Sequence, residues 1–267
     1  MKQFICIFML AGMLVACTNS KKDDSPKVSQ VTYSGIDLVT MKPISGIYSM
    51  EYDESGRAIK AGYMHFSYEK DKVTVKCDKD SLLNFRGVAE AELTLENGKP
   101  VSFLCHYATN PAMVCKGVFS EKDNAVMLEE NFYKEGTDSL MTNINIKWVV
   151  DEKGLMKEQS RSKSFGDSIS TTTLACSYDN YPTQKQMGLM ECIYAATIED
   201  FLLAAAGVTP YAIMGYPVSE KALMNQDQVY KMDIEYTFNE DSLCTGNKII
   251  YNTKDTTLVM LETQVKY

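Results

Sequence analysis

The sequence predicts a mostly β protein: an antiparallel up-and-down meander curled into a barrel or half-barrel, with a short helical insert. Apolar residues recur at every second position in several segments, which is the period of a strand with one buried face. Polar turn sequences separate these segments at the short intervals that consecutive hairpins require. Residues 198–206 break this pattern with a helical one.

The alternation is clearest in residues 89–96, 143–150 and 232–238. One face of each segment carries Ala, Leu, Ile, Met or aromatic side chains, and the other carries mainly Glu, Asp, Asn, Lys or Thr. Antiparallel sheets allow one face to pack while the other is solvated. We therefore expect these segments to be strands of one sheet with a single buried side.

Turn sequences of a similar kind join the expected strands. Asn97-Gly98 suits a type I′ hairpin turn, because both residues tolerate a positive φ. Four more segments begin with Asp, Ser or Asn, whose side chains can accept a hydrogen bond from the backbone two residues on. They are residues 53–56, 120–123, 151–154 and 239–242. These turns predict hairpins between consecutive strands, which is the connectivity of a meander.

The helical insert is predicted over residues 198–206, with the sequence IEDFLLAAA. Thr197 suits the N-cap position, Asp200 follows three residues later, and Gly207 suits the position just past the C-terminus of the helix. The apolar face of this helix is expected to plug the concave side or one end of the sheet. A second helical turn is a weaker expectation for residues 184–192, because a glycine interrupts it.

The N-terminus resembles the export signal of a bacterial lipoprotein. A lysine precedes the apolar residues 4–15, a stretch too short to span a bilayer as a mature helix. Leu14-Val15-Ala16-Cys17 resembles the lipobox, where a peptidase cleaves before a cysteine that carries the lipid. We predict a signal peptide over residues 1–16 and lipidation of Cys17. An ordinary signal peptide that contains a cysteine is the alternative.

Residues 17–27 are expected to be a lipidated tether, because they lack the apolar residues that a packed core requires. The run Lys21-Lys22-Asp23-Asp24 resembles the charged signal that routes Bacteroidetes lipoproteins to the outer face of the outer membrane. The lipid makes the membrane an expected partner, since several acyl chains anchor a protein stably. Residues 28–267 are expected to form a single β-rich domain in the cell envelope, lipid-anchored at the outer membrane and either periplasmic or surface-exposed.

Composition excludes several classes of partner and cofactor. The net charge of −8 argues against nucleic acid as a partner. The chain has only two histidines and lacks a C-x-x-C pair, which disfavours a zinc site. We therefore expect neither a metal nor another cofactor.

After removal of the predicted signal peptide, six cysteines remain beyond the lipidated one. They are Cys77, Cys105, Cys115, Cys176, Cys192 and Cys244. An exported protein permits up to three disulfides among them. Free cysteine is also among the most buried residue types, and we favour buried thiols on the apolar faces of strands.

The search for catalytic residues is mostly negative. Gly166-Asp167-Ser168-Ile169 resembles the start of a GDS-type hydrolase block, but its strand-and-turn setting favours a polar hairpin turn. His65 and His106 fall on the polar faces of their strands, so solvated positions are expected for both. Histidines that lack a placed carboxylate and nucleophile do not make a catalytic triad.

Paired carboxylates raise the alternative of a glycan-acting hydrolase. Glu129-Glu130 and Glu199-Asp200 are adjacent pairs, as is Asp23-Asp24 in the tether. Adjacent residues on a strand point to opposite faces, whereas a glycosidase pair must converge across a cleft. Convergence of carboxylates from distant strands stays open. On balance we predict that the protein is not an enzyme.

Tyrosine is abundant, with 16 residues, and exposed tyrosine stacks well on sugar rings and peptides. Most of these tyrosines are expected to pack in the sheet, where tyrosine is favoured. Tyr211 and Tyr216 follow the helix in residues 209–217 and form the predicted binding patch.

Two short segments carry a resemblance to a known family. Residues 177–182, SYDNYP, lead toward a helix that ends in LLAAAG, and residues 52–57 form a YD-type turn. Together with the lipobox, these features resemble Bacteroidetes lipoproteins of an uncharacterised domain group with a porin-like fold. The resemblance implies a long antiparallel sheet rolled around a helical insert. It implies no activity and no site residues.

Three functions therefore stand as hypotheses. The leading one is a non-catalytic module anchored at the outer membrane that binds a ligand or a partner, such as a glycan, a peptide or an outer-membrane protein. The second is a lipocalin-like carrier of a small hydrophobic ligand, which requires an empty apolar barrel. The third is a glycan-acting hydrolase, which requires carboxylates that converge in one cleft.

Overall fold

The protein is described by a computed structural model, and the parts of the chain that it describes contain sixteen strands and one helix. The described residues are 26–36, 42–78, 87–108, 112–123, 125–152, 155–165, 168–178, 197–208, 218–225, 228–252 and 257–267. The strands are β1 (Gln30–Ile36), β2 (Pro43–Tyr52), β3 (Ala58–Ala61), β4 (Met64–Glu69), β5 (Lys72–Cys77), β6 (Val88–Glu96), β7 (Lys99–Tyr107), β8 (Met113–Lys122), β9 (Ala125–Lys134), β10 (Leu140–Val150), β11 (Met156–Phe165), β12 (Ser168–Tyr178), β13 (Val218–Asn225), β14 (Gln228–Phe238), β15 (Cys244–Asn252) and β16 (Thr257–Lys266), and the helix is α2 (Ile198–Ala206).

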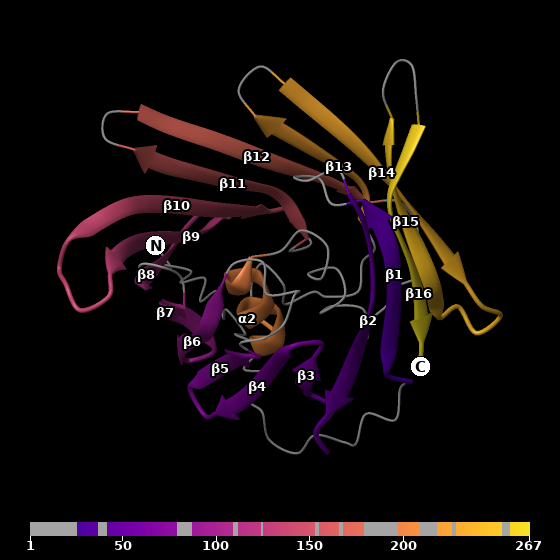
Figure 1. The fold of residues 1–267 in the computed structure, drawn as a ribbon, viewed down its shortest axis with the longest axis horizontal. Coiled ribbons are helices and arrows are strands. Elements are labelled where there is room, and N and C mark those ends of the chain that lie inside the picture. The colour runs from indigo at the N-terminus through magenta and orange to yellow at the C-terminus, as the bar shows by residue number, and fades with distance from the viewer. Residues whose placement is uncertain are drawn as a thin grey trace, which may run out of the picture.

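The strands form a closed antiparallel ring (Figure 1). Each strand pairs with the next one along the chain, as the meander prediction requires. The ring closes because β1 pairs with β2 on one side and with β16 on the other. The predicted barrel of consecutive hairpins is thereby confirmed.

The hairpin turns confirm most of the turn predictions. Asn97 and Gly98 have φ values of 52° and 77°, as the type I′ turn requires. Asp53 and Asn239 each accept hydrogen bonds from backbone groups two and four residues on. The turn predicted at residues 120–123 lies later, because β8 continues through Lys122 before the chain turns.

The inner face of the ring holds the apolar core. In β10, Ile144, Ile146 and Trp148 are buried, as their alternation predicts. In β6, a register shift places Val88, and not Ala89, on the buried face, because the bulge inserts an extra residue before Glu90.

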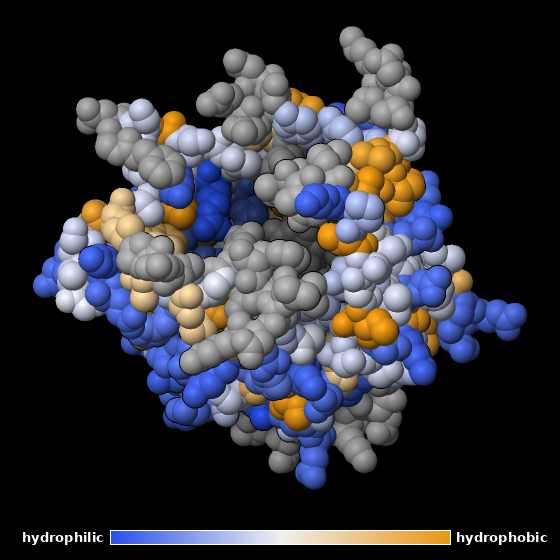
Figure 2. Space-filling view, viewed as in Figure 1, coloured by the Kyte–Doolittle hydropathy of each residue, from blue (hydrophilic) through white to orange (hydrophobic). Residues whose placement is uncertain are grey.

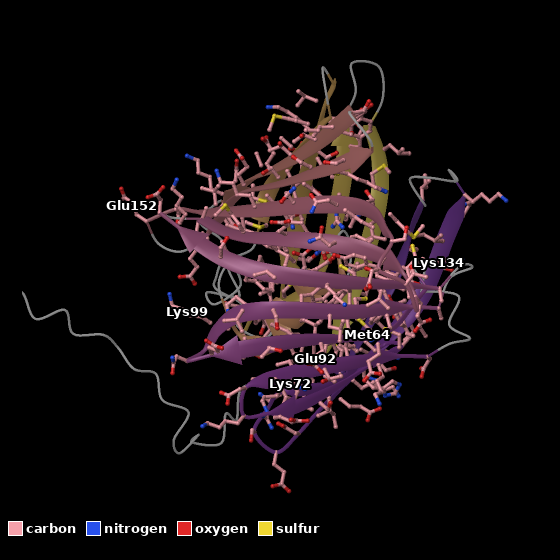
Figure 3. All side chains as sticks on the ribbon, turned by 90° about the vertical axis from the view of Figure 1, so that its left-hand side faces the viewer. Met64, Lys72, Glu92, Lys99, Lys134 and Glu152 are labelled. Carbon is pink, nitrogen blue, oxygen red and sulfur yellow. The ribbon has the colours of Figure 1, made fainter. Side chains whose placement is uncertain are left out.

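The outer face is polar and carries ion pairs across neighbouring strands. Lys72 Nζ on β5 lies 3.0 Å from Glu92 Oε2 on β6. Figure 3 labels this pair and also Met64, which is buried against the core. The wall therefore has a charged outside and a largely apolar inside.

Helix α2 lies inside the ring (Figure 1) and packs against β5 and β6. Asp200 Oδ2 accepts a hydrogen bond of 2.9 Å from the backbone N–H of Thr197, and Gly207 has a left-handed φ of 65°, so both predicted ends of the helix are confirmed. The helix fills part of the concave side, as expected. No helix in the described ranges is long and apolar enough to cross a membrane. The helical turn expected at residues 184–192 lies outside the described residues.

Five of the six cysteines are buried thiols: Cys77, Cys105, Cys115, Cys176 and Cys244. The preference for buried thiols is thereby confirmed for these five, and Cys192 lies outside the described residues. Burial raises the pKa of Cys77 to about 12, so this thiol is protonated and unreactive at neutral pH.

Closure of the ring depends on close backbone approach at Gly35 of β1. A Cβ atom at this position would lie 2.2 Å from the carbonyl oxygen of Met260 and 3.0 Å from the Cα atom of Leu261, both on β16. Backbone atoms cannot move aside without separating the two strands. Gly35 is therefore required at the seam between the first and last strands.

We predict that Gly35→Ala destabilises the barrel by about 1–3 kcal/mol, the usual cost of overpacking. The measurement is the free energy of unfolding from denaturant titration. Ser34→Ala is the matched control, because Ser34 is exposed on the same strand. Equal stability of the two variants would contradict the role of this seam.

Candidate functional site

Three carboxylates are buried inside the ring, where the first turn of α2 meets the barrel wall. Glu199 and Asp200 belong to the helix and are 1% and 2% exposed. Glu130 belongs to β9 and is 0% exposed. Its inward direction follows from register, because Glu130 lies directly opposite Ile144, a buried residue of β10. Fully buried carboxylates are rare and need partners, so this cluster is the candidate functional site.

Arg161 of β11 is the cation that faces two of these carboxylates. Its Nη2 atom lies 3.5 Å from Glu130 Oε2 and 3.9 Å from Glu199 Oε1. The thiol of Cys115 donates to Glu130 Oε1 at 3.6 Å. Glu199 Oε2 has no hydrogen-bond partner among the described residues. One guanidinium thus bridges a strand carboxyl and a helix carboxyl, over distances at the long end of direct contact.

The environment moves the pKa values of the two glutamates in opposite directions. Burial, followed by the charge of Glu199, raises the pKa of Glu130 well above its ordinary value. Burial alone would raise the pKa of Glu199 as well, but interactions with Glu130 and Arg161 lower it below its ordinary value. The two carboxyls therefore share one proton and carry one negative charge at neutral pH, with the opposite pKa directions favouring the proton on Glu130.

Asp200 connects the helix to the barrel wall. Its Oδ1 atom accepts hydrogen bonds from Trp148 Nε1 at 3.3 Å and from Gln159 Nε2 at 3.1 Å. Its Oδ2 atom accepts from the backbone N–H of Thr197 at 2.9 Å and from the Thr197 hydroxyl at 3.1 Å. The same carboxylate therefore caps α2 and joins it to β10 and β11.

The cluster brings together residues that the sequence left apart. Glu129 is exposed while Glu130 is buried, so the expectation of opposite faces is confirmed for this pair. The convergence of Glu130 with Glu199, which the sequence left open, is present. In the sequence, one acidic residue interrupts the otherwise apolar row of Val126, Leu128 and Phe132. This interruption was the pattern that could have indicated a buried carboxylate.

In acid–base catalysis, a protonated carboxyl group often serves as the acid and a neighbouring ionised carboxyl group as the base. A glycosidase, however, places its sugar between the two carboxyl groups. Here Arg161 faces both of them, and both glutamates are enclosed. The arrangement joins α2 to β9 and β11 through Arg161.

The other sequence-predicted residues fall elsewhere. Cys17, Tyr211 and Tyr216 lie outside the described residues, so the lipidation site and the tyrosine patch stay predictions. His65 and His106 have exposed side chains, as expected. Each histidine also has a carboxylate neighbour that the sequence did not reveal: Asp78 lies 3.1 Å from His65, and Glu135 lies 3.9 Å from His106.

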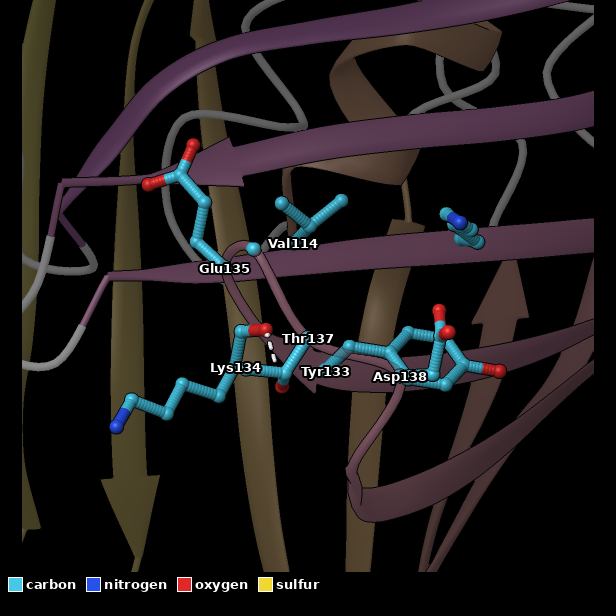
Figure 4. Close-up of a pocket in the computed structure, with 8 residues that line it drawn as sticks. Val114, Tyr133, Lys134, Glu135, Thr137 and Asp138 are labelled. Atoms are coloured by element: carbon cyan, nitrogen blue, oxygen red, sulfur yellow. Dashed lines mark hydrogen bonds between the residues drawn. The ribbon is translucent and has the colours of Figure 1, made fainter.

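A shallow pocket of about 260 Å³ lies where β8 begins, β9 ends and the chain turns toward β10 (Figure 4). Its lining includes Lys116 and Lys134 as well as Glu135 and Asp138. The Lys116 ammonium lies 5.5 Å from the centre of the Tyr133 ring. Cations and carboxylates are balanced here, so the pocket favours no ligand charge. In the described part of the chain, no cluster of three or more His, Cys, Asp or Glu side chains could hold a metal ion.

Two solved structures share the fold. A porin-like protein from Bacteroides vulgatus ATCC 8482 has a TM-score of 0.69 and 16% identity, over 90% of this chain and 98% of its own. A porin-like protein from Bacteroides uniformis ATCC 8492 has a TM-score of 0.53 and 10% identity, over 90% of this chain and 97% of its own. No protein-family model and no curated protein sequence matches the chain. The chain thus has a porin-like fold, and at these identities the likeness shows the fold alone.

We predict that Glu130→Gln stabilises the protein at alkaline pH. Because the pKa of Glu130 is raised on folding, the folded state binds more protons than the unfolded state above pH ~4.5, so stability falls as pH rises. Glutamine copies the protonated carboxyl and removes this dependence. The melting temperature of the variant should exceed that of the wild type at about pH 8, with little difference near pH 5.

Glu129→Gln is the matched control, since it changes an exposed glutamate on the same strand. Its melting temperature should follow the wild-type dependence on pH. Parallel pH profiles for wild type and Glu130→Gln would show that Glu130 is not protonated in the folded state.

We predict that Asp200→Asn loosens α2 from the wall and destabilises the protein by about 3 kcal/mol, because an amide cannot accept all four hydrogen bonds. Trp148 is the only tryptophan and is fully buried, so its fluorescence reports on this contact. Its emission should shift to longer wavelength, and acrylamide should quench it more strongly. Asp241→Asn, in an exposed turn, should leave both readouts unchanged.

Proposed function

We propose that the mature protein is an outer-membrane-anchored lipoprotein whose barrel stays in water and acts as a non-catalytic binding module. The observation that carries this proposal is the combination of a charged outer wall with an interior that is partly filled by α2. The porin-like neighbours from Bacteroides support a place in the cell envelope. Anchoring then comes from the lipid on Cys17, through the tether of residues 17–27.

The outer wall supports a position outside the lipid. A barrel that spans a membrane turns an apolar band outward. Here ion pairs lie on the outer face at several places around the ring, between β2 and β3, β5 and β6, β13 and β14, and β15 and β16. The pairs are Glu51–Lys60, Lys72–Glu92, Lys76–Glu90, Glu220–Lys231 and Lys248–Glu262, with N···O distances from 3.0 to 3.9 Å. Placing such groups in hydrocarbon is costly.

The rim formed by the starts of the even-numbered strands supports a partner at that end. Leu140 and Met141 begin β10, Ile169 lies near the start of β12, and Val229 lies near the start of β14. Their exposed fractions run from 49% to 72%. In a meander, the chain enters β1 at the opposite rim, so these residues lie at the other end of the barrel from the start of β1. Exposed apolar residues grouped at one place favour a binding surface.

The two alternatives fit the interior less well. A carrier of a small hydrophobic ligand requires an empty apolar barrel, but α2 packs against the apolar half of this one. A hydrolase requires carboxylates that a substrate can reach, but Glu130 and Glu199 are enclosed. Binding at the rim or in the remaining interior space therefore fits the described residues best.

The proposal predicts that the protein carries lipid and that the lipid alone holds it at the membrane. In the native host, wild type should incorporate a labelled fatty acid and enter the detergent phase on phase separation. Cys17→Ser should lose the label, and Ser20→Ala in the tether is the control that should keep it. Replacing residues 1–17 by a signal peptide that is cleaved without lipidation should give a water-soluble protein. Membrane retention of that protein would contradict a barrel that stays in water.

A further inference from the structure

The outer face of β9 to β12 differs in composition from the rest of the outer wall. Elsewhere ion pairs cross this wall, and Figure 2 shows strongly hydrophilic side chains along the lower edge of the ring, where β3 to β5 lie. On β9 to β12, amide and hydroxyl side chains from four consecutive strands form two cross-strand rows. One row is Asn131, Asn143 and Ser164, and the other is Asn145, Ser162 and Thr171. We call these six side chains the polar face.

The polar face points outward and is held by its own hydrogen bonds. Ile146 is buried on the inner side of β10, so Asn143 and Asn145, which alternate with it, lie on the outer side. Asn143 Nδ2 donates to Asn131 Oδ1 at 3.0 Å, and Asn145 Nδ2 donates to Asn143 Oδ1 at 2.7 Å. Because each amide group has two donors and one acceptor oxygen, these bonds leave hydrogen-bonding groups directed toward water.

The pocket of about 260 Å³ adjoins one end of the polar face. Tyr133 in its lining lies two residues from Asn131 on β9, and Lys116 lies directly opposite Asn131 on β8. The turn beside the pocket is fixed, because the backbone N–H and the hydroxyl of Thr137 both donate to the carbonyl oxygen of Lys134, at 3.1 and 2.9 Å. The pocket and the polar face therefore form one continuous outer surface.

The charges of this surface are balanced. The pocket is lined by the ammonium groups of Lys116 and Lys134 and by the carboxylates of Glu135 and Asp138. Glu135 also lies 3.9 Å from His106, so the balance holds while this imidazole is neutral. Toward the opposite rim, β9 to β11 carry two charged side chains of each sign: Glu129, Lys147, Lys157 and Glu158. Such a surface suits an uncharged ligand that both donates and accepts hydrogen bonds.

Tyr133 gives the pocket an aromatic surface. The ammonium of Lys116 lies 5.5 Å from the centre of this ring, and the lysine side chain is exposed. An ammonium group is attracted to the face of an aromatic ring, and the C–H groups of a sugar ring stack on the same kind of face. Leu140 lies opposite Tyr133 on β10 and is 54% exposed, so it extends the apolar part of this surface.

We propose that the pocket and the polar face bind an uncharged glycan chain. One sugar residue lies in the pocket against Tyr133, where Lys116 moves from the ring to a sugar hydroxyl, and the next residues lie along the polar face. Sugar hydroxyls donate and accept, which matches the ammonium, carboxylate and amide groups present. The pocket is smaller than those that usually enclose a small ligand, and so suits one unit of a longer chain. The inference rests on the proposed binding function and adds the class of ligand and its site.

The test is affinity electrophoresis of the full mature lipoprotein in neutral detergent, in native gels that contain a polysaccharide. Dextran, mannan, soluble starch and β-glucan are the uncharged probes, and polygalacturonate is the anionic one. At least one uncharged probe should retard the protein, and polygalacturonate should not. Retardation by no uncharged probe, or equal retardation by polygalacturonate, would overturn the glycan site.

Two variants of Tyr133 test the pocket. Tyr133→Leu should weaken binding of the retarding glycan about tenfold, because it removes the ring, whereas Tyr133→Phe keeps the ring and should bind close to wild type. Trp148 fluorescence and the melting temperature check that both variants fold. Equal affinity of Tyr133→Leu and wild type, with the fold intact, would contradict a sugar residue at this ring.

Asn145→Ala tests the polar face and should weaken binding about fivefold, as for the loss of hydrogen bonds to the chain. Asn252→Ala is the matched control, because it changes an exposed asparagine on β15, and it should leave binding unchanged. Calorimetry with a tryptic digest of casein separates the failures. Heat from the digest without binding of a glycan would overturn the glycan site and leave the binding module in place. Failure of the anchoring proposal would appear separately, as a lipid-free mature protein.

Discussion

A ring of sixteen strands encloses more space than its own inward side chains can fill. Barrels of about eight strands are filled by side chains alone, whereas those of sixteen or more leave a channel unless something enters it. In this protein the ring is closed by the pairing of β1 with β16, so the interior must be occupied or hydrated. Helix α2 occupies part of this interior, and the polar inward side chains of β11 and β12 line another part of it.

Helix α2 and the polar side chains of β11 and β12 lie on different sides of the interior. On one side, α2 packs Phe201, Leu202 and Leu203 into a core to which the first ten strands and β16 contribute. On the other side, Gln159, Arg161 and Lys163 of β11 share the inward face with Trp148, Ile146 and Ile144 of β10. The carboxylate cluster lies at the boundary, where burial of Glu130 and Glu199 is tolerated because they share one proton and face one guanidinium.

The porin-like fold does not carry the function of a porin with it, because a fold and a site are separate matters. The ion pairs on the outer wall suit water, and α2 occupies space that a channel would leave open. Under the proposed function, the lipid on Cys17 holds such a barrel in the envelope without a membrane crossing. Under the same proposal, partner recognition depends on the apolar rim.

Local patterns in the sequence determined most of the elements. The alternation around Trp148, the Asn97-Gly98 turn and the caps at Thr197 and Gly207 predicted strands, hairpins and α2, because each depends on residues close together in the chain. Closure through Gly35, the bulge beside Val88, and the contacts among Glu130, Arg161 and Glu199 were decided only by tertiary structure. A carboxylate on a strand has the same local signature whether it faces water or a guanidinium, and only the ring brings residues from β9, β11 and α2 to one point.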